Sequence, residues 1–220
     1  MRKIIGRGRG RASLWATLTC FTFVLPPGPV RAGDETPETP EGKWAAELGS
    51  GVTFSNIRNS KIAGYTLVPV QLSLSRRLDG ARLENFAGGW FRGTPEVILM
   101  GRYTGVAHGV ESYIAEFGFG GRYNFEQPGR RWSPFGELTV GLAWADAHPF
   151  LVDGVQHGLG QDFNFAFTAS TGVRYDITDR TYMRLSLVYS HYSNGALSEP
   201  AHSNKAIDAL GPMLSFGVRF

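Results

Sequence analysis

The sequence predicts an eight-stranded antiparallel transmembrane β-barrel of the bacterial outer-membrane type, and three observations support this fold class. From Lys43 to Phe220, apolar and polar residues alternate with a period of two, in eight segments separated by turn-forming stretches. One face of these segments is apolar with aromatic residues toward its margins, which suits lipid, whereas the other combines small and charged residues, which suits a narrow lumen. No run of 18 apolar residues occurs, so no transmembrane helix is expected.

Residues 1–32 are typical of a secretory signal peptide. They hold six basic residues and no acidic one, and a short apolar stretch extends from Leu14 to Leu25. Small residues after this stretch favour cleavage behind Ala32. Residues 33–42 are acidic and proline-rich, which predicts a flexible spacer before a barrel over residues 43–220.

The excess of basic residues belongs to this leader. Beyond residue 32 the chain has 16 basic and 19 acidic residues, so the predicted mature protein is mildly acidic and no nucleic acid partner is expected. The only cysteine, Cys20, also lies in the leader. The predicted mature chain therefore offers no thiol for a disulfide, a zinc–thiolate site or a cysteine nucleophile.

Eight strands are predicted from the alternation. They cover Trp44–Asn56, Val68–Ser75, Glu96–Thr104, Tyr113–Phe125, Phe135–Trp144, Phe163–Tyr175, Thr181–Asn194 and Leu210–Phe220. A transmembrane strand needs roughly 9–11 residues, so eight of them fit between residue 43 and the C-terminus. Charged residues on the small-residue face are expected to form ion pairs inside the lumen. They are Glu116, Arg122, Glu137, Arg174, Arg184 and Arg219.

The last predicted strand ends on Phe220 after a regular alternation of apolar residues, and this ending resembles the sorting signal of outer-membrane barrels. The predicted location is therefore the outer membrane of a Gram-negative bacterium. The main alternative fold is a secreted β-sandwich or a lipocalin-like barrel, which would bury the apolar face and expose the other.

A histidine and a serine stand two positions apart near the end of the seventh predicted strand. His191 and Ser193 share the parity of Leu185 and Leu187, so both are expected to face lipid. Their Cα atoms would lie about 6.5–7 Å apart, close enough for a hydrogen bond between imidazole and hydroxyl. A serine nucleophile needs such a pair, because a neutral imidazole accepts the hydroxyl proton during attack.

Asp208 is the candidate for the acid that would hold the imidazole ring. Its parity matches that of Leu210 and Leu214, so in a regular final strand its side chain also faces outward. This orientation requires that no bulge interrupts the strand near Pro212. With both termini on the periplasmic side, the site would lie at the outer end of the wall, where a polar residue costs only about 0–1 kcal/mol.

Two segments near the C-terminus, His191–Asn194 and Asn204–Asp208, have the pattern His-x-Ser-Asn and then an asparagine four residues before an acid. This pattern, before a short final strand, resembles the PagL family of lipid A 3-O-deacylases from Gram-negative outer membranes. The resemblance implies an eight-stranded barrel with its active site on the outer wall. It also implies hydrolysis of the ester-linked acyl chain at position 3 of the reducing-end glucosamine of lipid A, with no metal and no cofactor.

By this resemblance, His191 is the general base, Ser193 the nucleophile and Asp208 the acid of a catalytic triad. Asn194 and Asn204 are the residues expected to shape the oxyanion region and position the substrate. The sequence departs from the best-known family members in two ways. Its acid is aspartate where they have glutamate, and the segment between the serine and the acid is about three residues longer.

These departures leave Glu199 as the alternative triad acid. The expected partners are lipopolysaccharide, as the substrate, and the lipid of the outer membrane, and a homodimer is compatible with the sequence. Two other functions stay open. One is an outer-membrane phospholipase, whose family places a His-x-Ser pair on a larger, calcium-dependent barrel, and the other is a non-enzymatic structural or adhesive barrel.

Four further histidines fall in predicted loops without paired spacing and are interpreted as surface residues. They are His108, His148, His157 and His202. Aromatic residues on the apolar face are interpreted as lipid contacts and interfacial anchors. Those on strands next to Ser193 could instead line a groove for an acyl chain.

Overall fold

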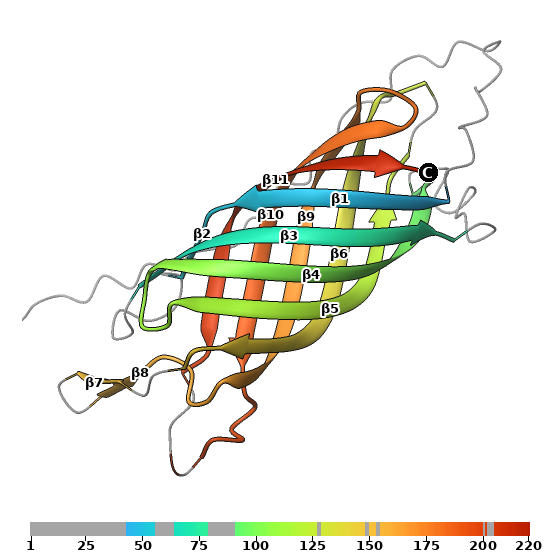
Figure 1. Cartoon of the computed structure of the whole chain (residues 1–220). Helices are drawn as coiled ribbons and strands as arrows, with labels where there is room; N and C mark the ends of the chain where they lie inside the picture. Colours follow the sequence, from blue (N-terminus) through green and yellow to red (C-terminus); the bar gives the residue numbers. More distant parts are fainter. Residues whose placement is uncertain are drawn as a thin grey trace, which may run out of the picture. The chain divides into compact units, whose positions relative to one another are not determined.

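The computed structural model describes residues 43–55, 64–78, 91–126, 129–147, 150–152, 155–199, 201 and 205–220. These residues form a closed eight-stranded antiparallel β-barrel (Figure 1), which confirms the predicted fold class. Within them, no helix is long and apolar enough to cross a membrane. The predicted signal peptide and spacer lie outside the described residues.

Consecutive barrel strands pair with each other, and the first strand pairs with the last. The strands are β1 (Trp44–Gly51) with its continuation β2 (Thr53–Ser55), β3 (Tyr65–Arg77), β4 (Thr94–His108), β5 (Tyr113–Asn124), β6 (Trp132–Ala145), β9 (Phe163–Asp176), β10 (Thr181–Ser193) and β11 (Ile207–Arg219). Pairing of β1 with both β3 and β11 closes the barrel. A separate hairpin of β7 (Phe150–Val152) and β8 (Val155–His157) extends from the connection between β6 and β9 (Figure 1).

The two faces of the wall differ as the alternation predicts. Along β10, the even-numbered residues are buried in the barrel, whereas Met183, Leu185 and Leu187 are exposed on its outside. The outward side chains of Leu72 and Phe119 are each 62% exposed. A continuous exposed apolar surface is unfavourable in water but suits a wall that contacts lipid.

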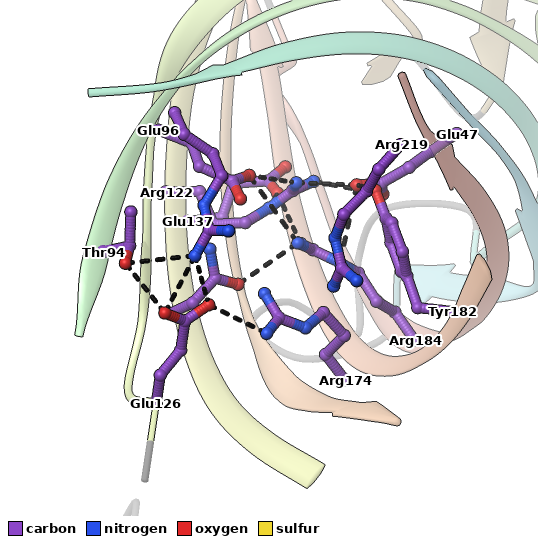
Figure 2. Close-up of polar contacts among 12 residues, drawn as sticks. Glu47, Thr94, Glu96, Arg122, Glu126, Glu137, Arg174, Tyr182, Arg184 and Arg219 are labelled. Atoms are coloured by element: carbon purple, nitrogen blue, oxygen red, sulfur yellow. Dashed lines mark hydrogen bonds and ion pairs between the residues drawn. The ribbon is translucent and has the colours of Figure 1, made fainter. Parts of the chain in front are cut away.

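Ion pairs fill the lumen at the end where the barrel begins and ends. Arg122 on β5 lies at their centre, with nitrogen–oxygen distances of 2.7 Å to Glu47, 3.0 Å to Glu96 and 2.7 Å to Glu137 (Figure 2). Arg184 approaches the same three carboxylates at distances from 3.5 Å to 4.0 Å. Because buried charges are costly unless they are paired, this network explains how the narrow lumen holds them, and it confirms the predicted lumenal ion pairs.

Replacing Arg122 with methionine should destabilise the barrel by about 3–5 kcal/mol, because three buried carboxylates would lose their nearest cation. Denaturant unfolding in detergent micelles measures the free energy of unfolding. The matched control is Arg76→Met, because Arg76 lies on the outside of the wall over the ring of Trp44 and its loss should cost no more than about 1 kcal/mol. Equal stability of Arg122→Met and the unmodified barrel would contradict a stabilising role for the network.

The rim near the barrel termini carries a second ion-pair group. Glu126, which follows β5, binds Arg174 at 2.9 Å (Figure 2) and Arg77 at the same distance. Burial acts to raise the pKa of Glu126, but the two guanidinium groups outweigh it and lower that pKa. The stabilisation by this carboxylate is therefore present above the ordinary glutamate pKa and is lost as the pH falls through the lowered value.

The opposite end of the lumen is closed by apolar packing. Ile114, Leu159 and Ile207 are fully buried there, in one cluster with neighbouring tyrosines and alanines. Glu111 accepts hydrogen bonds from the hydroxyl of Tyr65 at 2.7 Å and from the backbone N–H of Leu159 at 2.6 Å. These bonds hold the segment that follows β8 against the barrel mouth.

Two histidines do not lie in loops as the sequence predicts. His108 is the last residue of β4, and His157 is the last residue of β8. The predicted strand Glu96–Thr104 ends too early because strand pairing continues beyond the apolar alternation, as far as the pairing of His108 with Thr66. His148 and His202 lie outside the described residues.

Candidate active site

The last two strands bring the predicted site residues together. In the pairing of β10 with β11, His191 stands directly opposite Asp208. Both side chains are on the outside of the wall, because Ser190, Tyr192 and Ala209 next to them are buried in the lumen. The pairing of the two strands runs without a bulge past Pro212, which confirms the predicted orientation of Asp208.

His191 and Asp208 form a direct contact. The Nδ1 atom of His191 lies 2.8 Å from Oδ1 of Asp208, and the two side chains are 37% and 24% exposed. Since a carboxylate can only accept, Nδ1 carries the proton of a neutral ring, and Nε2 is left as the basic nitrogen. The same oxygen of Asp208 also accepts a hydrogen bond from the hydroxyl of Tyr189. The acid is therefore held by two donors from one strand.

Ser193 is the last residue of β10 and is half-buried on the outer side, like His191. A spacing of two residues on a strand places the two Cα atoms about 6.5–7 Å apart. The backbone N–H of Gly195 donates a hydrogen bond to the Oγ of Ser193 at 3.3 Å. This N–H is a backbone donor directly beside the hydroxyl.

The turn after Ser193 has an unusual backbone. Gly195 has φ of 62° and Ala196 has φ of 68°, so two consecutive residues occupy the left-handed region. For alanine this conformation is unfavourable by about 1–3 kcal/mol, and such strain persists only where the surroundings impose it. Here it turns the chain sharply, so that the N–H of Gly195 points back at Ser193.

Side chains in the lumen fix the outer end of β10 through contacts with its inward-facing residues. Arg102 donates a hydrogen bond to the Oγ of Ser190 at 3.0 Å and forms an ion pair of 3.3 Å with Glu116. The hydroxyl of Tyr192 donates to the same carboxylate at 3.1 Å. The inward neighbours of His191 on both sides are thereby fixed, which keeps the histidine in one position on the wall.

The other predicted site residues lie elsewhere. Asn194 is fully buried and faces inward, and its amide donates to the Oγ of Ser198 at 2.8 Å. Glu199 is exposed in the following turn, where its backbone N–H donates to the carbonyl of Ala196. Asn204 lies outside the described residues. Of the two candidate acids, the structure thus brings Asp208 to His191.

An open apolar groove crosses the outside of the wall from β4 to β11 and includes Tyr189 on β10. It follows one row of paired residues from strand to strand, over a length of about 24 Å at roughly 4.8 Å per strand. The row consists of Val97, Gly121, Leu138, Ala169, Tyr189 and Leu210. Gly121 and Gly136, which bear no side chain, and Ala169 lower the floor of the groove.

Two of the three predicted catalytic residues, His191 and Asp208, lie on the row next to this groove. That row consists of Leu99, Phe119, Val140, Phe167, His191 and Asp208. Beyond it, Ser193 is paired with Phe165, whose ring packs against that of Phe163 with centroids 5.5 Å apart. Trp144 continues this aromatic group, with its ring 5.5 Å from that of Phe163. The site therefore has an apolar groove on one side and an aromatic wall on the other.

Comparison with known proteins identifies the family. A family model described as lipid A 3-O-deacylase (PagL) matches residues 79–217, which is more than half of the chain. The chain belongs to the PagL family. It is accordingly a Gram-negative outer-membrane β-barrel, and the family to which it belongs is one of lipid A-modifying hydrolases.

Solved barrels share the fold of this PagL-family chain. The crystal structure of the outer membrane enzyme PagL superposes with a TM-score of 0.50 at 19% identity, over 80% of this chain and 99% of the other. Neisserial surface protein A superposes with a TM-score of 0.50 at 12% identity, over 80% of this chain and 96% of the other. No curated protein sequence matches the chain.

Two residues that contact the candidate catalytic residues are absent from the expectations based on sequence. Tyr189 has the parity of His191 and precedes it by two positions, but on a lipid-facing strand a tyrosine is most simply an interfacial anchor. Gly195 follows an asparagine, a combination that predicts a turn with positive φ. Parity and turn chemistry were therefore present as signals, although neither indicates contact with a particular oxygen.

In the segments that the structure describes, no group of three His, Cys, Asp or Glu residues could hold a metal ion.

Proposed function

We propose that this protein is a lipid A 3-O-deacylase that hydrolyses the ester-linked acyl chain at position 3 of the reducing-end glucosamine, with Ser193 as nucleophile, His191 as general base and Asp208 as the acid of the triad. The observation that carries the proposal is the contact of 2.8 Å between His191 and Asp208 on the outer wall, two residues from Ser193. Membership of the PagL family supplies the substrate class.

The position of the site in the barrel agrees with a substrate in the outer leaflet. Ser193 and Asp208 lie at the end of the barrel opposite its termini, where the connection between β10 and β11 is long. The sequence predicts that both termini of the barrel lie on the periplasmic side. With this orientation, the site is proposed to meet the outer leaflet near its polar margin.

In the proposed reaction, the Oγ of Ser193 attacks the acyl carbonyl carbon while its proton passes to Nε2 of His191. The bond between the carbonyl carbon and the sugar oxygen then breaks, and that oxygen takes the proton from His191. Water hydrolyses the resulting acyl-serine through the same histidine, which releases the fatty acid and restores the Ser193 hydroxyl. The carboxylate of Asp208 stabilises the imidazolium that forms in each step.

The N–H of Gly195 is proposed as one donor to the oxyanion, because it lies beside the Oγ of Ser193 and would be next to the carbonyl oxygen of an ester bound there. Asn204 remains proposed as a second donor on the basis of the family pattern. Asn194 was expected to share this role, but its buried amide is engaged with Ser198. Asn194 is therefore proposed to support catalysis indirectly, by shaping the turn that presents the N–H of Gly195.

The groove is proposed to hold the acyl chain of the substrate. It runs beside the row of His191 and Asp208, and its exposed lining is almost entirely apolar. An acyl chain laid along it would contact a surface shaped by Gly121, Gly136 and Ala169, and it would pass over the row of His191 to bring its ester to Ser193. Contact over several methylene groups gives such a groove a preference for chain length.

Filling the groove at Gly136 should therefore shift the preference toward shorter acyl chains. A Cβ at Gly136 would meet no atom within 4 Å, so Gly136→Leu places its side chain in the groove without displacing the wall. We expect kcat/KM for the longest accepted 3-acyl chain to fall by about 10-fold or more. Mass spectrometry of fatty acids released from lipid A with mixed acyl chains measures the profile.

Gly101→Leu is the matched control for this experiment. Gly101 is exposed on β4, has equally open space for a Cβ, and is absent from the groove lining. Its substitution should leave the chain-length profile unchanged. An unchanged profile in Gly136→Leu, with Gly101→Leu also unchanged, would place the acyl chain outside the groove.

A further inference from the structure

The hydroxyl of Tyr189 touches the triad acid that the proposed reaction uses. It donates a hydrogen bond to Oδ1 of Asp208, the same oxygen that lies 2.8 Å from Nδ1 of His191. Tyr189 precedes His191 by two residues on β10, so both side chains stand on the outer side of the wall. Asp208 is paired with His191, and Leu210 is paired with Tyr189. The carboxylate is therefore held between two donors of the facing strand.

We propose that Tyr189 is a positioning residue, which fixes the carboxylate of Asp208 so that His191 presents its Nε2 to Ser193. This inference rests on the proposed function, since it assigns a part in the same reaction to a residue that does not itself touch the scissile bond. It adds a fourth side chain to the site, acting through the acid.

The surroundings explain why the acid needs a second donor. Asp208 stands on an apolar wall with its side chain only 24% exposed, and a carboxylate in such a place is unfavourable unless donors satisfy its oxygens. Hydrogen bonds to an ionised group are about twice as strong as those between neutral groups. The tyrosine hydroxyl therefore satisfies the carboxylate of Asp208 and restricts its rotation.

The ring of Tyr189 suits this position as well. It lines the apolar groove next to Leu210, while its hydroxyl reaches the polar site on the next row. A tyrosine combines an apolar body with a polar tip, so it can line the groove and bind the acid at once. Phenylalanine would keep the first property and lose the second, which makes the two separable.

The test measures kcat and KM separately for the full-length barrel with Tyr189→Phe in detergent micelles, with purified lipid A as substrate. Removal of a partner that orients a working group typically costs 10- to 100-fold, so we expect kcat to fall by about 10-fold with KM nearly unchanged. Tyr103→Phe is the matched control, because Tyr103 is an exposed outer-wall tyrosine of β4 that stacks on Tyr113 away from the site. It should leave both constants unchanged.

A double-mutant cycle with Asp208→Asn shows whether Tyr189 acts through the acid. If it does, adding Tyr189→Phe to Asp208→Asn should cause no further loss, whereas an independent role would give the full 10-fold loss in both backgrounds. Undiminished kcat in Tyr189→Phe, a change confined to KM, or equal losses in both backgrounds would each overturn the proposal. Ser193→Ala in the same assay tests the proposed function separately from the role of Tyr189. Activity of this variant would overturn the proposed function itself.

Thermal melting by circular dichroism accompanies each variant. A loss of kcat in Tyr189→Phe at an unchanged melting temperature supports positioning, since the barrel is then intact. If the melting temperature falls together with kcat, the assay is repeated at a lower temperature, at which the variant is folded. We expect the 10-fold loss of kcat to persist there. Recovery of full kcat under those conditions would assign Tyr189 a purely structural role and overturn the proposal.

Discussion

Replacing Ser193 with alanine should abolish release of the 3-acyl chain from lipid A. The hydroxyl is the only group proposed to bond to the acyl carbon, so its loss removes covalent catalysis entirely. Losses for a triad nucleophile reach roughly 10⁶-fold in kcat, and we expect at least about 10³-fold here. Mass spectrometry of lipid A from cells that express the variant should show the chain retained, where cells with the unmodified protein show it removed.

Thr66→Val is the control for this experiment. Thr66 faces outward near the same end of the barrel, on β3, which does not pair with β10. Its hydroxyl should be dispensable for deacylation. Normal removal of the chain by a well-folded Ser193→Ala barrel would exclude the proposed nucleophile and leave only the family assignment.

The fold and the faces of its wall could be predicted because both depend on a period of two. A strand that contacts lipid on one side and a packed lumen on the other must alternate, and eight such segments in this length permit few arrangements. The same parity placed His191, Ser193 and Asp208 on the outside before any pairing was known. The lumenal ion pairs could be predicted because the charged residues alternate with small ones. This combination indicates a narrow lumen, in which opposite charges must pair.

Contacts between strands could not be predicted in this way, because they depend on register. The sequence does not state that Asp208 lies opposite His191, nor that its carboxylate reaches the hydroxyl of Tyr189. The groove needs five strand pairings in register, and two of them bring Gly121 and Ala169 into one row. Small residues scattered over several strands carry no visible pattern in the sequence.

Asn194 illustrates the limit of a family pattern. Its role was taken from the resemblance, whereas its parity, opposite to that of Ser193, indicates the lumen. The structure agrees with the parity, because Asn194 is fully buried. Gly195, one residue further, is the backbone donor next to the hydroxyl, since the strained turn reverses the chain direction there.

Replacing Asp208 with asparagine should reduce kcat by roughly 10²- to 10⁴-fold while the barrel stays folded. The amide has the same size, but it carries no charge to stabilise the imidazolium, and its N–H₂ can turn toward Nδ1 and reverse the tautomer of His191. Initial rates of fatty acid release from lipid A in micelles measure the loss. A variant as active as the unmodified protein would contradict the role of Asp208.

The same assay separates Asp208 from the alternative acid. Glu199 is exposed in the turn after β10, so Glu199→Gln should retain full activity if Asp208 holds the imidazole. Asp208→Glu keeps the charge and lengthens the side chain by one methylene, so it should recover part of the activity that Asp208→Asn loses. If Glu199→Gln were instead the inactive variant, the pairing of His191 with Asp208 would be structural, and the loop carrying Glu199 would have to close over His191 during catalysis.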